Sequence, residues 1–215
     1  MSPAVSPLPA RLLLIRHGET DNNVGQIFRG PESGQSPLNA TGFQQARQLA
    51  NNLKVLNLLR PRVYASTYVR AHQTAQPIAE ALGIPLHTLK NVHEVDTGAF
   101  VGRPYAHMDK FEHEMTAPDG AYGFPGGESL VGAGERFHAA LREVRPQPGE
   151  TVLIVSHGAV LVAVLAKLLG LDPRETWRSD TYRHTNTAVT ELHWNETNPP
   201  EIVRLADAGE LEKLY

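Results

Sequence analysis

The hydrophobic pattern near the start of the chain ends abruptly in polar residues. Residues 12–15 are four consecutive apolar residues, and they are followed at once by Arg16, His17 and Gly18. An apolar run without alternation is typical of a parallel strand that is covered on both faces. Open α/β sheets bind ligands just beyond the carboxyl ends of their strands, so this turn is a candidate site.

The same pattern occurs a second time later in the chain. Residues 151–155 form another apolar run, which leads into Ser156, His157 and Gly158, while a third run over 63–66 leads towards Arg70. If these three strands are neighbours, two arginines and two histidines meet at one edge of the sheet. Arginine matches the oxygens of phosphate well, so we expect an anion pocket there.

The remaining pattern predicts an α/β fold: a three-layer sandwich with a mostly parallel central sheet and helices on both faces. Helical periodicity predicts helices over 40–59, 68–82, 135–145 and 160–169, and apolar runs predict further strands over 84–89, 187–194 and 202–205. Residues 1–10 are expected to be a disordered tail and 11–215 a single domain. Repeated Gly and Pro residues over about 95–134 indicate an irregular lid.

Composition narrows the classes of protein. With 215 residues and a formal net charge of −3, the chain suits one domain and lacks the basic surface that nucleic acids require. The absence of cysteine excludes disulfides and thiol chemistry and suits a reducing compartment, so we expect a cytoplasmic protein. The apolar stretch over 152–170 is interrupted by His157 and Lys167, which favours a buried strand and helix over a membrane span.

The motifs taken together resemble the histidine phosphatase superfamily, also called the phosphoglycerate-mutase-like family. Residues 14–20, Leu-Ile-Arg-His-Gly-Glu-Thr, match the family signature. Later motifs follow in the expected order over about 11–194: 37–42, 66–75, 94–102, 126–129 and 156–158. Two positions depart from the family pattern. Asn39 stands where Thr is usual, and Val101 stands in place of a second acid, which leaves the substrate preference open.

This resemblance implies a two-step reaction through a phosphohistidine. His17 corresponds to the nucleophile, and Arg16, Arg70 and His157 would hold the phosphoryl oxygens. Glu94 matches the position of the proton donor, which would later act as the base towards water. A neutral imidazole is a competent nucleophile if its ring is held, and the other ring N–H of His17 could bind a nearby backbone carbonyl.

Three further residues belong to the expected phosphate- or substrate-binding set. Asn23 falls where the family has a pocket asparagine, Gly158 follows the second histidine, and Ser129 belongs to the Gly-Gly-Glu-Ser motif. Ser129 could equally serve only as the cap of the following helix. We expect no cofactor and no metal site. Side chains of the site already supply the positive charge, and the acidic residues lack the ordered spacing of metal ligands.

Three functions remain open. The first is a metal-independent phosphatase acting on a small phosphomonoester with a carbohydrate, carboxylate or aromatic body. The second is a cofactor-dependent phosphoglycerate mutase, which would need more cations than Arg103 and Lys110, the only ones in the lid. The third is a catalytically silent binding protein. We expect no nucleic acid or membrane partner, and a homodimer is left open. The lid's large apolar residues are expected to form a wall beside the phosphate: Tyr105, Met108, Phe111, Met115, Tyr122 and Phe124.

Overall fold

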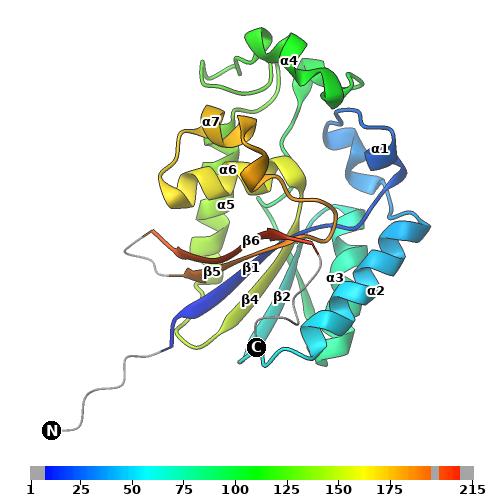
Figure 1. Ribbon diagram of the computed structural model, residues 1–215, viewed down its shortest axis with the longest axis vertical. Coiled ribbons are helices and arrows are strands. Elements are labelled where there is room, and N and C mark those ends of the chain that lie inside the picture. The colour runs from blue at the N-terminus through cyan, green and yellow to red at the C-terminus, as the bar shows by residue number, and fades with distance from the viewer. Residues whose placement is uncertain (1–7, 195–198, 209–215) are drawn as a thin grey trace, which may run out of the picture.

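A six-stranded sheet lies at the centre of the computed structural model, which describes residues 8–194 and 199–208 (Figure 1). The strand order is β3-β2-β4-β1-β5-β6. The first four strands in this order run parallel, and β5 and β6 are antiparallel to their neighbours. The strands span Ala10–Arg16 (β1), Pro61–Ser66 (β2), Leu86–Leu89 (β3), Thr151–Ser156 (β4), Val189–Trp194 (β5) and Glu201–Asp207 (β6).

The two central strands are covered on both faces, as their apolar runs predict. Leu12 and Leu14 of β1 pack into one core cluster, whereas Leu13 and Ile15 pack into the other. Helices α2 (Ala40–Lys54) and α3 (Val69–Leu82) cover one face, and α5 (Leu130–Val144) and α6 (Gly158–Leu169) cover the other (Figure 1). The predicted three-layer α/β sandwich is confirmed.

Helix ends show where periodicity misleads. Helix α2 ends at Lys54 rather than at residue 59, and Leu56 still packs into the core from the turn that leads to β2. Helix α5 begins at Leu130, five residues before the predicted start at 135. Its glycine content argued against helix, yet a Cβ on Gly134 would lie 2.6 Å from the carbonyl oxygen of Ala163, so glycine allows α5 to approach α6 closely.

Three short helices, α1 (Asp21–Val24), α4 (Met108–Phe111) and α7 (Pro173–Arg178), were not predicted. Helix α7 follows α6 directly and begins with Asp172 as N-cap, whose side chain accepts a hydrogen bond from Glu175 N–H. Helices α1 and α4 lie in the loops, together with the other short elements: η1 (Pro31–Gln35), η2 (Gly98–Phe100), η3 (Tyr105–His107), η4 (Glu112–Glu114) and η5 (Asp180–Tyr182).

The lid segment 95–134 consists mainly of such short turns, and α4 lies beyond the end of the sheet at the top of Figure 1. Its predicted apolar wall is largely wrong. Tyr105 and Met108 do line the cavity described below, but the other four residues do not. They pack into or against the main core: Phe111, Met115, Tyr122 and Phe124. Burial of such large apolar side chains stabilises the folded state.

Both ends of the chain bear on earlier expectations. Strand β1 begins at Ala10, inside the predicted tail, and residues 1–7 of that tail lie outside the described residues. Among the described helices, none combines the length and the apolar character that crossing a membrane requires.

Candidate active site

The turn after β1 is held by three different elements. His17 N–H donates to the carbonyl of Ser156 at the end of β4 (3.0 Å), and Gly18 N–H donates to Thr74 Oγ1 of α3 (2.9 Å). A Cβ on Gly18 would lie 2.6 Å from the carbonyl oxygen of Gly42 at the start of α2. Only glycine fits this close approach, so the turn is wedged between β4, α3 and α2.

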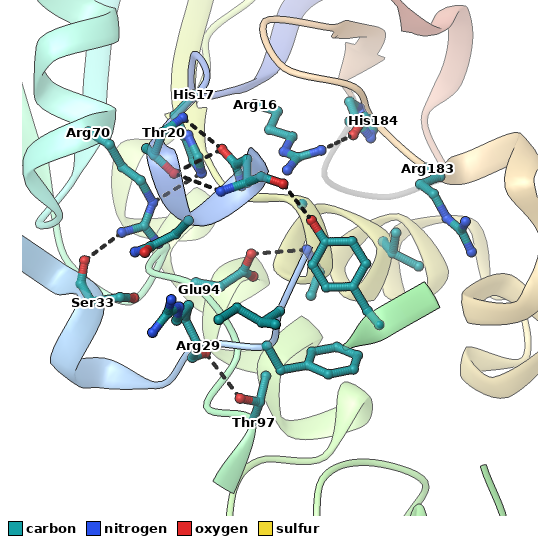
Figure 2. A pocket seen from close by; sticks show the side chains of 18 of the residues that line it. Arg16, His17, Thr20, Arg29, Ser33, Arg70, Glu94, Thr97, Arg183 and His184 are labelled. Carbon is teal, nitrogen blue, oxygen red and sulfur yellow. Dashed lines mark hydrogen bonds between the residues drawn. The ribbon is translucent and has the colours of Figure 1, made fainter. Parts of the chain in front are cut away.

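The ring of His17 is held in one tautomer. Its Nδ1 lies 2.6 Å from the carbonyl oxygen of Gly18, which accepts only, so Nδ1 carries the proton as the sequence predicted. Arg70 Nε donates to His17 Nε2 at 3.0 Å. Nε2 is therefore unprotonated, and its lone pair accepts this hydrogen bond beside the cavity, where Figure 2 shows His17 and Arg70 together.

The charge state of His17 follows from its surroundings. Burial, and then the positive charges of Arg70 and Arg16, hold the pKa of His17 well below its ordinary value of 6.5. The imidazole therefore stays neutral at neutral pH. A neutral ring with an unprotonated Nε2 is the form in which histidine acts as a nucleophile.

Two arginines flank this histidine. Arg70, only 6% exposed, donates through Nη1 to the carbonyl of Ser33 (2.8 Å), and Arg16 donates through Nη1 to the carbonyl of His184 (2.6 Å). The Nε of Arg16 is buried and has no hydrogen-bond partner among the described residues. Burial lowers the pKa of both guanidinium groups and nearby Glu94 raises it, yet arginine stays charged. The two cations can therefore bind an anion beside His17.

His157 stands at the N-cap position of α6, where its side chain makes no capping hydrogen bond, and is fully buried. Its ring meets that of His17 edge to face at a centroid distance of 5.1 Å, and it is not itself among the residues that line the cavity. Its Nε2 lies 2.6 Å from Ser66 Oγ, which also accepts a hydrogen bond from Tyr68 N–H.

Burial, with Arg70 as the next cause, holds the pKa of His157 well below 6.5, so its ring carries one proton. Among the described residues the Ser66 hydroxyl has no other acceptor, so it donates to Nε2 and leaves the proton on Nδ1. That Nδ1 is buried without a partner. It is a donor for which an anion oxygen is the natural acceptor.

Glu94 reaches the cavity from the loop after β3. Its Oε1 accepts backbone N–H groups from Val95 (2.9 Å) and Val160 (3.0 Å), and its Oε2 accepts from Ala159 (3.3 Å). Ala159 and Val160 belong to the first turn of α6, where the helix dipole favours a negative group. Helix α6 therefore carries Gly158 and orients Glu94 on the same cavity.

The remaining predicted residues divide into two groups. Asn23 and Gly158 line the cavity, and Asn23 Oδ1 accepts from Thr20 N–H and from Asn186 Nδ2 (3.2 Å), which fixes its amide. Ser129 does not line the cavity. It caps α5 by accepting from Gly132 N–H (2.9 Å), and it donates to Asp119 Oδ2 (2.6 Å).

A cavity of about 250 Å³ is lined by Arg16, His17, Asn23, Arg70, Glu94 and Gly158. Several of its residues were not anticipated: Arg29, Ser33, Trp177, Arg183 and His184 all line it. Asn186 was also missed, although its side chain donates to the carbonyl of His17 (3.0 Å) and so ties the C-terminal loop to the turn. None of these residues lies in a periodic pattern, and only the Asp-Pro start of α7 could have indicated Trp177.

The described residues contain no cluster of three or more His, Asp or Glu side chains arranged to hold a metal ion. The chemical groups of the cavity are instead guanidinium, imidazole and one carboxylate. Such a set can bind a phosphate group, offer it a nucleophilic nitrogen and exchange a proton with it.

The chain belongs to the histidine phosphatase superfamily (branch 1), whose family model matches residues 12–208. The family membership that the sequence motifs indicated is therefore confirmed.

Individual relatives include both phosphatases and mutases. The probable phosphoglycerate mutase GpmB of Yersinia pestis is 34% identical over 193 residues, which is 87% of this chain and 86% of that protein. The mycobacterial glucosyl-3-phosphoglycerate phosphatase, in a structure with VO3, is 27% identical with a TM-score of 0.74 and covers 93% of this chain and 100% of that one. Bacillus stearothermophilus YhfR is 29% identical with a TM-score of 0.75, covering 94% and 99%.

Proposed function

We propose that this protein is a phosphomonoester hydrolase that acts on a small phosphorylated metabolite through a phosphohistidine on His17. The observation that carries the proposal is the unprotonated Nε2 of a neutral, buried His17, which accepts a hydrogen bond from Arg70 and has Arg16 beside it. The similarity to a mycobacterial phosphatase over nearly the whole chain supports it.

In the first step the Nε–H of Arg70 moves from His17 Nε2 to a phosphoryl oxygen, the released lone pair of Nε2 attacks phosphorus, and the ester P–O bond breaks. Its electron pair goes to the leaving alkoxide, which takes a proton from Glu94. Arg16, Arg70 and the Nδ1–H of His157 stabilise the charge on the phosphoryl oxygens. Because these groups supply the positive charge and the donors, the proposed reaction requires no metal.

In the second step a water molecule attacks the phosphorus of the phosphohistidine. Glu94, now ionised, takes a proton from that water, and the N–P bond breaks with its electron pair returning to Nε2. Inorganic phosphate leaves and both side chains recover their starting state. One carboxyl group therefore serves as acid and then as base.

A phosphoglycerate mutase is the second candidate, and the identity to GpmB favours it. A mutase must keep its phosphohistidine away from water and hold a bisphosphate, which requires cations on the lid. The lid residues that line this cavity are Thr97, Tyr105 and Met108, and none is charged. The lack of charged lid residues among those that line the cavity supports the hydrolase.

Phosphorus NMR separates the two candidates. The protein, freed of metal with a chelator, is incubated with 3-phosphoglycerate, with and without 2,3-bisphosphoglycerate, and with a panel of phosphomonoesters. We expect inorganic phosphate from members of the panel and no 2-phosphoglycerate. Rapid formation of 2-phosphoglycerate that depends on the bisphosphate would establish the mutase, and no turnover of any compound would favour a silent binding protein.

A further inference from the structure

The cavity contains an arginine that the proposed chemistry does not use. Arg29 lines the cavity and forms no ion pair among the described residues. Its Nε is buried and has no hydrogen-bond acceptor there. A buried donor without a partner destabilises the folded state, so the folded chain alone gives no reason for its position.

The backbone around Arg29 is fixed from both sides. Thr97 Oγ1 donates to the carbonyl of Arg29 (3.0 Å), and the preceding residue, Phe28, exchanges backbone hydrogen bonds with residues 102 and 103 of the lid (both 2.9 Å). The neighbouring acids have other partners: Glu32 Oε1 accepts from Gly30 N–H and Asp96 Oδ1 accepts from Gly98 N–H. The guanidinium is therefore presented to the cavity by a rigid support.

Arg29 also lies apart from the groups around the nucleophile. The cations that lower the pKa of His17 are Arg70 and Arg16, and Arg29 is not among them. Figure 2 shows Arg29 beyond Glu94 as seen from Arg16, and Arg183 on the opposite side of the view. Arg183 differs from it in being mostly exposed and paired with Asp180 at 3.0 Å.

The charges of the cavity set a limit on the ligand. The charged lining residues are four arginines and one glutamate: Arg16, Arg29, Arg70, Arg183 and Glu94. The lining histidines, His17 and His184, are neutral because burial lowers their pKa values. Asp180 offsets Arg183, and Glu94 carries the proton that it donates in the proposed reaction, so three positive charges remain and a phosphomonoester dianion neutralises two of them. One positive charge remains, which matches a carboxylate better than a second phosphate or an uncharged body.

We propose that Arg29 binds a carboxylate of the substrate and thereby selects phosphomonoesters that carry one. The planar fork of arginine binds a carboxylate through two parallel hydrogen bonds, which would give the unpartnered Nε an acceptor. This inference rests on the proposed function for the identity of the phosphate site and narrows its substrate class. Arg29 is then a specificity-determining residue rather than part of the phosphoryl-transfer chemistry.

The test compares two probes that differ in one group. 3-Phosphoglycerate and glycerol 3-phosphate share a skeleton, and the first has a carboxylate where the second has a hydroxymethyl group. Their binding is measured by calorimetry on the H17A background, in which neither is turned over. We expect H17A to prefer 3-phosphoglycerate by roughly 10- to 100-fold, the range of a charge-assisted hydrogen-bonded pair.

Adding R29Q is expected to remove most of that preference while changing the affinity for glycerol 3-phosphate about twofold or less. R29K keeps the positive charge but lacks the planar guanidinium group, so its ratio of affinities for the two probes should be intermediate. R178Q is the matched control, because Arg178 is an exposed arginine on α7 beside Trp177 and does not line the cavity. With R178Q added to H17A, the ratio of affinities for the two probes should equal that of H17A alone.

Equal affinities for the two probes on the H17A background, or binding of neither, would overturn the proposal. So would tighter binding of 2,3-bisphosphoglycerate than of 3-phosphoglycerate that is lost in R29Q, since Arg29 would then serve a second phosphate. Hydrolysis of p-nitrophenyl phosphate by the wild-type protein reports the proposed function separately. If the protein hydrolyses p-nitrophenyl phosphate but Arg29 does not affect the preference for 3-phosphoglycerate over glycerol 3-phosphate, this inference alone is refuted. If Arg29 determines that preference but the protein hydrolyses nothing, the proposed function alone is refuted.

Discussion

At the scale of single residues, hydrogen-bond partners set the protonation state and the orientation of the groups in the site. His17 is the clearest case, because the Gly18 carbonyl accepts a hydrogen bond from Nδ1–H and Nε2, which is unprotonated, accepts one from Arg70. The Glu94 carboxylate is likewise held in one orientation by three backbone N–H groups. Each of these contacts assigns a protonation state or an orientation, and each assignment has a measurable consequence.

The role of Glu94 can be tested through the leaving group. E94Q keeps the size of the side chain but cannot donate a proton, and general acid catalysis typically contributes 10²- to 10⁴-fold. We expect the rate of phosphohistidine formation from an alkyl phosphate to fall roughly 100-fold or more, and that from p-nitrophenyl phosphate, whose leaving group needs no proton, to fall less than about tenfold. Rapid-quench single turnovers measure this first step apart from the second, and equal losses on both substrates would argue against Glu94 as the proton donor.

At the scale of elements, the ends of parallel strands and the starts of helices place nearly every group of the site. β1 and β4 lie side by side and in register, so Arg16 pairs with Ser156 and the two histidines follow together. Helix α3 brings Arg70 to the same edge, and α6 brings Gly158 and the amides that hold Glu94. Loops supply the rest of the cavity wall.

Ser129 tests the distinction between an element cap and a ligand. S129A removes the acceptor for Gly132 N–H, and loss of an N-cap costs about 1 kcal/mol. We expect the free energy of unfolding, measured by urea denaturation, to fall by about that amount while KM for the best substrate is unchanged. T116A in the same lid segment is the control, because Thr116 is exposed and its hydroxyl has no partner among the described residues. A large rise in KM for S129A with unchanged stability would make Ser129 a substrate ligand after all.

At the scale of the whole molecule, the fold buries neutral histidines that an unfolded chain would protonate. His17 and His157 are held well below 6.5, and burial, aided by Arg16, lowers the pKa of His184 to about 4. Below about pH 6.5 the unfolded state therefore takes up protons that the native state does not. The free energy of unfolding must fall as the pH falls through this range.

His184 allows a quantitative form of this prediction. With a pKa of about 4 in the native state and 6.5 when unfolded, it accounts for roughly 2–3 kcal/mol of lost stability between pH 7.5 and pH 4.5. H184Q lowers stability at pH 7.5 through its lost bond to Thr190, but its pH dependence should be flatter than that of the wild type by that amount. Denaturant unfolding at the two pH values measures both slopes. H107Q, at an exposed position, should keep the wild-type slope, and an unchanged slope in H184Q would refute the assignment.

Most of the fold and the centre of the site were accessible from the sequence because both depend on strong local patterns. The doubly covered strands at β1 and β4 are short, unbroken apolar runs, and His17 and His157 come just after them, while Arg70 comes four residues after the run at β2. Arg29 was not accessible, because it lies in an irregular loop where no periodicity assigns a direction to a side chain. The predicted aromatic lid wall was wrong for a related reason: Phe124 is fully buried in the core, and loop sequence alone does not say which way an aromatic ring turns. The cytoplasmic location, the homodimer and the lid as a moving unit stay predictions.

The measurement that tests the central claim most directly is the capture of the phosphoenzyme. The protein is mixed with a ³²P-labelled substrate, quenched with alkali within milliseconds to seconds, digested, and the labelled peptide is sequenced by mass spectrometry. The account predicts an alkali-stable, acid-labile phosphate on His17, absent in H17A and longer-lived in E94Q for a substrate with a good leaving group. A label on any other residue, or steady turnover by H17A near the wild-type rate, would contradict it.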